Sequence, residues 1–189
     1  LHTALRRQRQ MCIRDRGFVG SLTLGVGQFC TNPGLLITGG EGRSQFAERI
    51  ASLAGEAAPA AMLHKGIAEA YRSASEEMMA KDGVKTLAQV AAEEGSSQGG
   101  AVVLGADAAE FLSDPSMGEE MFGPATLMVS ADDEATMLKV AESLEGQLTA
   151  TVHATEEDLE MFGKLIAVLE RKAGRLVYNG FPTGVEVCH

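Results

Sequence analysis

The sequence predicts an α/β fold, in which helices pack on a mostly parallel sheet. Short apolar runs bounded by glycine and other turn residues alternate along the chain with segments whose apolar residues recur every three or four positions. Runs of the first kind are typical of buried strands, and segments of the second kind are typical of helices. Strands separated by helices favour parallel pairing, because a parallel pair needs a long crossover connection.

Each expected strand is short and lies beside turn residues or next to a helical segment. These runs cover residues 35–38, 101–105, 126–129, 148–154 and 175–179. The last of them ends at Asn179, which we expect to satisfy backbone groups at the strand end. Residues 181–183 form a candidate substrate loop.

The expected helices follow from apolar residues spaced three or four positions apart. The sequence predicts helices over residues 17–29, 46–55, 64–80, 84–94, 132–144 and 155–173. Thr155 and Asp158 have the spacing of a capping box, so they mark the start of the last helix. Residues 95–100 and 111–116 are expected to be loops.

Length and composition indicate one acidic, soluble domain or a large piece of one. The 189 residues are 45% hydrophobic and carry a formal net charge of −10, which argues against nucleic-acid binding. The three cysteines, at positions 12, 30 and 188, have neither disulfide-framework nor metal-site spacing, which favours a reducing cytosol and no metal. The chain has no apolar run of membrane-spanning length and no secretory signal, so we expect a cytoplasmic protein that binds no membrane.

Residues 1–16 differ in composition from the rest of the chain. They contain five arginines and no lysine, whereas the whole sequence is acidic. A nucleic-acid arm and a targeting peptide are two interpretations. The run over residues 9–16 favours a third, because it resembles translated adapter sequence. We therefore expect residues 1–16 to be non-native or disordered, and Cys12 to have no function.

Cys30 is the candidate functional residue. It follows an apolar run and precedes Asn32-Pro33-Gly34, a strong turn signal, so it is expected at a junction between helix and loop. A thiol at such a place can be buried and still reachable. Two interpretations are open at this point: a nucleophile that reacts as the thiolate, or a small buried hydrophobic side chain.

Three motifs, in the same order along the chain, resemble those of the NAD(P)-dependent aldehyde dehydrogenases. The first is Gly-Gln-Phe-Cys at residues 27–30, and the longer run over residues 17–34 resembles the subgroup that oxidises alpha-ketoglutaric semialdehyde (2,5-dioxovalerate) to 2-oxoglutarate. The second and third lie at residues 119–124 and 178–189. The resemblance covers residues 17–189 and implies part of the family's catalytic domain, incomplete at both ends.

The resemblance also implies the roles of individual residues. Cys30 would attack the aldehyde and form a thiohemiacetal, which becomes a thioester that water hydrolyses. Phe29 and Thr31 would line the aldehyde tunnel. Glu120 would bind the nicotinamide ribose of NAD or NADP, and Phe122 would touch the nicotinamide ring.

Several parts of the family's machinery have no counterpart in this sequence. The general-base glutamate, the oxyanion asparagine and the cofactor domain lie upstream of the cysteine in the family, so most of the cofactor site is expected outside this chain. We therefore expect the chain alone to be inactive and its parent to be a homo-oligomer. The alternatives are a cofactor-free association domain and another thiol enzyme, such as a peroxidase, that uses Cys30.

Overall fold

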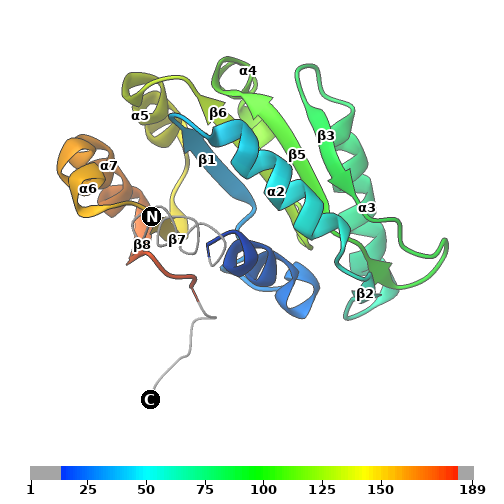
Figure 1. The fold of residues 1–189 in the computed structure, drawn as a ribbon. Helices are drawn as coiled ribbons and strands as arrows, with labels where there is room; N and C mark the ends of the chain where they lie inside the picture. Colours follow the sequence, from blue (N-terminus) through cyan, green and yellow to red (C-terminus); the bar gives the residue numbers. More distant parts are fainter. Residues whose placement is uncertain (1–13, 183–189) are drawn as a thin grey trace.

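A four-stranded sheet forms the centre of the computed structural model, which describes residues 14–182 (Figure 1). The strand order is β1-β6-β5-β3. The strands are β1 (Leu35–Gly39), β6 (Ala125–Ala131), β5 (Val102–Asp107) and β3 (Lys85–Gln89). The first three are parallel, and β3 pairs antiparallel with β5 at one edge. The prediction of an α/β fold with a mostly parallel sheet is confirmed.

Helices cover both faces of this sheet. The first helix, over residues 14–23, and α2 (Arg43–Gly55) pack on one face. The opposite face carries α3 (Lys65–Met79), α4 (Ala108–Ser113) and α5 (Glu134–Ser143). A parallel sheet covered in this way is buried on both faces, which explains why its strands are short continuous apolar runs.

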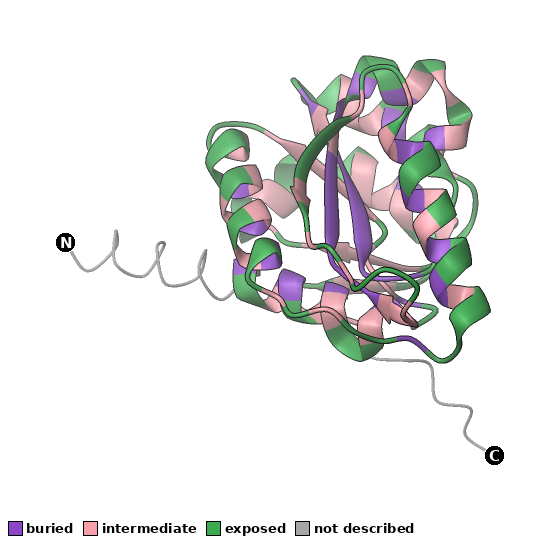
Figure 2. Cartoon of the chain, turned by 90° about the vertical axis from the view of Figure 1, so that its right-hand side faces the viewer, coloured by how far each residue is buried: buried purple, intermediate pink, exposed green. Residues whose placement is uncertain are grey.

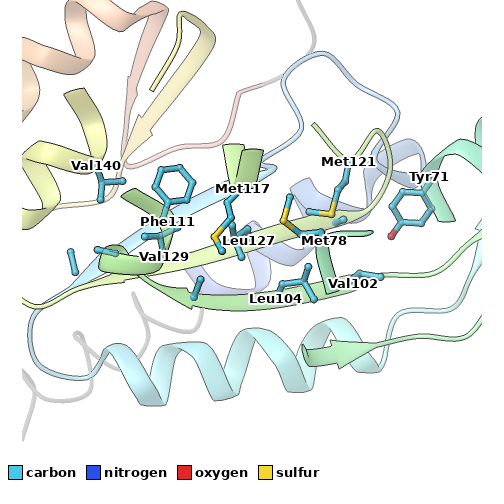
Figure 3. Packing of buried hydrophobic residues seen from close by; sticks show 14 of the residues in the cluster. Tyr71, Met78, Val102, Leu104, Phe111, Met117, Met121, Leu127, Val129 and Val140 are labelled. Carbon is cyan, nitrogen blue, oxygen red and sulfur yellow. The ribbon is translucent and has the colours of Figure 1, made fainter. Parts of the chain in front are cut away.

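The central strands alternate between two hydrophobic clusters. Val103 and Met128 pack with the first helix and α2, whereas Leu104, Leu127 and Val129 pack with the helices of the other face. All five side chains are buried. Figure 2 shows the buried residues concentrated at the centre of the molecule, and Figure 3 shows the larger cluster. The two clusters follow the period of two that is expected for a strand.

A second, parallel sheet lies on the side of α5, where α7 (Gly163–Lys172), which covers this sheet, packs against α5 (Figure 1). It consists of β7 (Gln147–Val152) and β8 (Ala173–Tyr178), which are connected through α6 (Glu156–Met161) and α7. Thr155 caps α6 in a complete capping box with Asp158, as the sequence predicted. None of the helices in the described part of the chain has the length and apolarity that a membrane crossing requires.

Asn179 joins the end of β8 to the end of β7. Its Oδ1 accepts a hydrogen bond from the N–H of Ala154, and its Nδ2 donates one to the Ala154 carbonyl, each at 3.0 Å. The backbone of Asn179 has φ = 50°, a conformation that asparagine tolerates better than most residues. The expectation that Asn179 satisfies backbone groups at a strand end is confirmed.

Three of the predicted elements are wrong. Residues 95–100, expected to be a loop, include the short strand β4 (Gln98–Gly99), which pairs antiparallel with β2 (Ala60–Ala61). Residues 84–94 contain β3 in place of a helix, because the segment pairs with the free edge of β5 and places Leu87 against Gly105. Residues 111–116 include the end of α4 and the start of a 3₁₀ helix, η2 (Pro115–Gly118), in place of a loop. Asp114 followed by proline is a helix-start signal, and Asp114 caps η2.

The first helix begins before residue 17. Asp15 is fully buried and lies between two cations, with Oδ1 3.1 Å from Arg14 and Oδ2 2.8 Å from Arg49. Residues 14–16 are therefore part of the packed structure, whereas residues 1–13 of the predicted basic segment lie outside the described residues. The helix also ends earlier than predicted, at residue 23.

Candidate active site

A left-handed turn redirects the chain between the first helix and Cys30. Gly25, Val26 and Gly27, in the 3₁₀ segment η1 (Leu24–Gly27), have φ values of 55°, 56° and 67°. This conformation is costly for the β-branched Val26. A Cβ on Gly27 would lie 2.2 Å from the carbonyl carbon of Gly123, so only glycine fits. The turn therefore seats the cysteine loop directly on the backbone at Gly123.

The thiol and its neighbours differ in exposure. Cys30 is exposed, Phe29 is 39% exposed, and Thr31 is buried. Gln28 accepts a hydrogen bond from the N–H of Leu63 through Oε1, at 3.0 Å. Cys30 and Phe29 are thus accessible to a ligand, whereas the side chain of Thr31 points into the interior of the protein.

Asn32 fastens the other side of the cysteine loop. Its Nδ2 donates a 2.8 Å hydrogen bond to the carbonyl of Gly123, which is 91 residues away in the sequence. The chain then enters β1, where the N–H of Leu127 donates to the Gly34 carbonyl at 2.9 Å. Cys30 is therefore bracketed by Gly27 and Asn32, which both contact Gly123.

The second motif approaches the site from η2. Met121 is buried among core side chains (Figure 3), whereas Glu120 and Phe122 are exposed, Phe122 by 38%. Gly123 and Pro124 are buried again, and β6 begins at Ala125. Burial of Met121 and Gly123 on either side of Phe122 leaves the carboxylate and the aromatic ring accessible.

Tyr71, from α3, packs against Gly123. A Cβ on Gly123 would lie 2.3 Å from Tyr71 Cδ2, and the Tyr71 hydroxyl donates a 2.7 Å hydrogen bond to the Gly100 carbonyl. Burial raises the pKa of Tyr71 well above its usual range, so the phenol stays neutral. The backbone on which both loops rest is therefore supported by a fixed ring.

The structure brings the Cys30 loop and the loop of Glu120 and Phe122 together through Gly123. It places Phe181, from the predicted substrate loop, against Gly17, with its ring centroid 4.8 Å from that of His153. Thr183 of that loop lies outside the described residues. Among residues 14–182, no group of three or more His, Cys, Asp or Glu side chains could hold a metal ion.

Sequence reasoning missed four residues that build this region. Tyr71 was predicted only as part of a helical stripe, and Gln28 and Asn32 were noted only as parts of motifs and turns. His64 caps α3 by accepting from the N–H of Ile67 at 3.3 Å. Histidine is not among the residues preferred at a helix N-cap, so the sequence carried no signal for the capping role of His64.

Two curated proteins match nearly the whole chain. Alpha-ketoglutaric semialdehyde dehydrogenase 2 of Azospirillum brasilense is 46% identical over 174 residues, which are 91% of this chain and 33% of the relative. Alpha-ketoglutaric semialdehyde dehydrogenase of Acinetobacter baylyi is 41% identical over 171 residues, which are 89% of this chain and 32% of the relative. The chain therefore spans about a third of the length of these relatives. No protein-family model matches it.

Solved structures share the fold at lower sequence identity. The delta-pyrroline-5-carboxylate dehydrogenase of Mycobacterium tuberculosis superposes with a TM-score of 0.78 at 18% identity, over 94% of this chain and 34% of that one. PnpE, solved in complex with nicotinamide adenine dinucleotide, gives a TM-score of 0.76 at 19% identity, over 93% of this chain and 37% of that one. Over the segment that its relatives share with it, the chain belongs to the aldehyde dehydrogenase family.

Proposed function

We propose that residues 17–189 are part of the catalytic domain of an NAD(P)-dependent aldehyde dehydrogenase in which Cys30 is the nucleophile. The observation that carries the proposal is the shared contact at Gly123, which joins the loop of an exposed thiol to a loop with an exposed carboxylate and an exposed aromatic ring. The names of the curated relatives favour alpha-ketoglutaric semialdehyde as the aldehyde.

Cys30 would begin the reaction. Its sulfur, as the thiolate, adds to the aldehyde carbon, and the electron pair of the carbonyl bond moves to oxygen. The product of this addition is a thiohemiacetal bound to Cys30. The backbone N–H of Cys30 would donate a hydrogen bond to the new oxyanion, which is the usual way in which such charge is stabilised.

The exposed side chains of the second motif fit the nicotinamide end of a dinucleotide. Glu120 can accept hydrogen bonds from ribose hydroxyls, and the Phe122 ring can limit where the nicotinamide lies. When NAD or NADP is bound, its nicotinamide supplies the hydride acceptor. Phe29 would line the path of the aldehyde, whereas the buried Thr31 would shape the site from behind.

The proposal includes the setting of the parent enzyme. We expect it to be cytoplasmic, to form homo-oligomers and to bind neither nucleic acid nor membrane. The formal net charge of −10 supports the exclusion of nucleic acid. The general base and most of the dinucleotide site would come from the remaining two thirds of the length of such relatives.

A chimera tests this function. In it, residues 17–189 of this chain replace the matching segment of the Azospirillum relative, and NAD- and NADP-dependent oxidation of alpha-ketoglutaric semialdehyde is measured. We expect turnover that Cys30→Ala abolishes and that Cys188→Ala retains, because Cys188 lies outside the Gly-Gln-Phe-Cys motif of the nucleophile. Full activity of the Cys30→Ala chimera would remove Cys30 from the mechanism. In the same chimera, Glu120→Gln should raise the KM for the dinucleotide more than it lowers kcat.

A further inference from the structure

We propose that Asn32 is a positioning residue, whose amide fixes the Cys30 loop to Gly123 and so sets the thiol against the loop of Glu120 and Phe122. The inference deepens the proposed function and rests on it for the role of Cys30. The contact itself is independent of that role. It is a 2.8 Å hydrogen bond between Asn32 Nδ2 and the Gly123 carbonyl.

The geometry of the cysteine loop points to this residue. Gly27 and Asn32 stand on the two sides of Cys30, and both contact the same backbone segment, at Gly123 and Pro124. The Gly27 contact is a close approach between backbones, which prevents nearer approach but does not hold the loop in place. The Asn32 bond is directional and attractive, so it supplies the hold that the Gly27 contact lacks.

The partner of Asn32 is a fixed point. Gly123 is buried, the Tyr71 ring fills the space that a side chain on Gly123 would need, and the Tyr71 hydroxyl donates a hydrogen bond to the Gly100 carbonyl. The Asn32 bond therefore ties the Cys30 loop to a part of the backbone that is itself held in place.

The orientation of the Asn32 amide follows from its partner. A carbonyl can only accept, so Nδ2 must face Gly123 and Oδ1 must face away. Among the described residues, the buried Oδ1 has no hydrogen-bond partner. The Asn32 side chain thus keeps its donor bond to Gly123 although its oxygen stays without a partner. We infer that the donor bond is the reason for an asparagine at this position.

The experiment measures the separation of the two loops directly. The sequence contains no tryptophan, so Phe122→Trp introduces a unique fluorophore on the second loop. In a Cys12→Ser, Cys188→Ser background, a nitroxide attached to Cys30 quenches this tryptophan only at short range. We expect strong quenching with Asn32 present and loss of quenching in Asn32→Asp at neutral pH, where the carboxylate repels the Gly123 carbonyl.

Acid provides a rescue that a general loss of stability would not show. Burial against a carbonyl raises the pKa of the introduced Asn32→Asp carboxyl above its ordinary value of about 3.9. Once protonated, its O–H can donate to the Gly123 carbonyl. Quenching should therefore return as the pH falls from 7 toward 4, while the nitroxide-labelled chain that keeps Asn32 stays quenched throughout.

The chain's other asparagine offers a matched control. Asn179 also donates its amide to a backbone carbonyl, that of Ala154, so Asn179→Asp removes the same kind of bond at another place. It should leave the quenching unchanged at every pH. Asn32→Ala, which removes the donor without adding charge, should lose quenching without acid rescue, and it serves as the test if Asn32→Asp fails to fold.

Unchanged quenching in a folded Asn32→Asp or Asn32→Ala variant would overturn the proposal. A second measurement separates this result from failure of the proposed function. Iodoacetamide alkylation of unlabelled Cys30 should slow about fivefold in Asn32→Ala, the factor that corresponds to one hydrogen bond. In a third outcome, quenching is lost but Cys30 is alkylated equally slowly with and without Asn32. Asn32 would then still hold the two loops together, but Cys30 would not be an activated nucleophile.

Discussion

The ring of Tyr71 fills the space that a side chain on Gly123 would need, because a Cβ built there would lie 2.3 Å from Tyr71 Cδ2. A Cβ built on Gly27 would lie 2.2 Å from the carbonyl carbon of Gly123. Gly123 is thus held between a core ring and the cysteine loop, which makes the packing of α3 and the geometry of the site depend on one another.

Gly123→Ala should destabilise the protein. The added methyl group would overlap the buried Tyr71 ring, and overpacking of this kind costs about 1–3 kcal/mol. Urea unfolding followed by circular dichroism measures the loss. Gly34→Ala is the control, since a Cβ at Gly34 would meet nothing within 4 Å and should change the free energy of unfolding by less than about 0.5 kcal/mol. Equal effects of the two substitutions would contradict this account of Gly123.

Thr126→Val should stabilise the protein. The Thr126 hydroxyl is fully buried in β6 and has no hydrogen-bond partner among the described residues. Valine has a similar shape and removes an unsatisfied group, so the free energy of unfolding should rise by about 1 kcal/mol. Thr23→Val is the matched control, because the Thr23 hydroxyl donates a 2.9 Å hydrogen bond to the Val19 carbonyl. A Thr126→Val protein less stable than the parent would show that the hydroxyl has a partner, such as a buried water.

The strands that the sequence predicted best are those whose two faces are both covered. Residues 35–38 and 126–129 read as apolar runs because β1 and β6 lie between helix layers. β3 was missed for the opposite reason. It is an edge strand whose residues are mostly exposed, so its few apolar side chains also fit a helical spacing.

In the candidate site, too, the features that depend on neighbouring residues could be predicted, and those that depend on contacts between distant residues could not. Cys30, Glu120 and Phe122 lie in motifs that can be recognised in the sequence. The bond from Asn32 to Gly123 joins residues 91 apart and involves a backbone carbonyl, so no pattern of side chains could indicate it. Phe29 and Thr31 flank Cys30 and have the same predicted role, and the exposure of the first and the burial of the second likewise depend on the tertiary turn.

The stability that Asp114 contributes should depend on pH. Asp114 caps η2, the 3₁₀ helix that precedes Glu119. The pKa of Asp114 is lowered mainly by hydrogen bonds from Ser116 and, to a smaller extent, by one from Lys81. A lowered pKa in the folded state means that the contribution is complete above the unfolded value of about 3.9 and is lost as the pH falls through the folded value. Asp114→Asn should therefore lower the Tm at pH 7, and the difference from the parent should shrink below pH 4.

The control for this prediction is Asp82→Asn, which removes an exposed carboxylate next to Lys81. It should change the Tm little at either pH. A difference between Asp114→Asn and the parent that stays constant from pH 7 to pH 3 would mean that the ionised carboxylate is not the stabilising form.

This chain, expressed alone, should not oxidise aldehydes at a measurable rate. Cys30 is exposed and can still be alkylated, but hydride transfer requires the nicotinamide to be held beside the substrate, and such positioning is worth several kcal/mol of the barrier. Glu120 and Phe122 could hold only one end of a dinucleotide. Without a general base, hydrolysis of a thioester would slow by a further factor of about 10²–10⁴. The measurement is NADH or NADPH formation with a panel of semialdehydes, alongside the Cys30→Ala variant. Turnover that disappears in Cys30→Ala would mean that these 189 residues supply both a base and a cofactor site of their own.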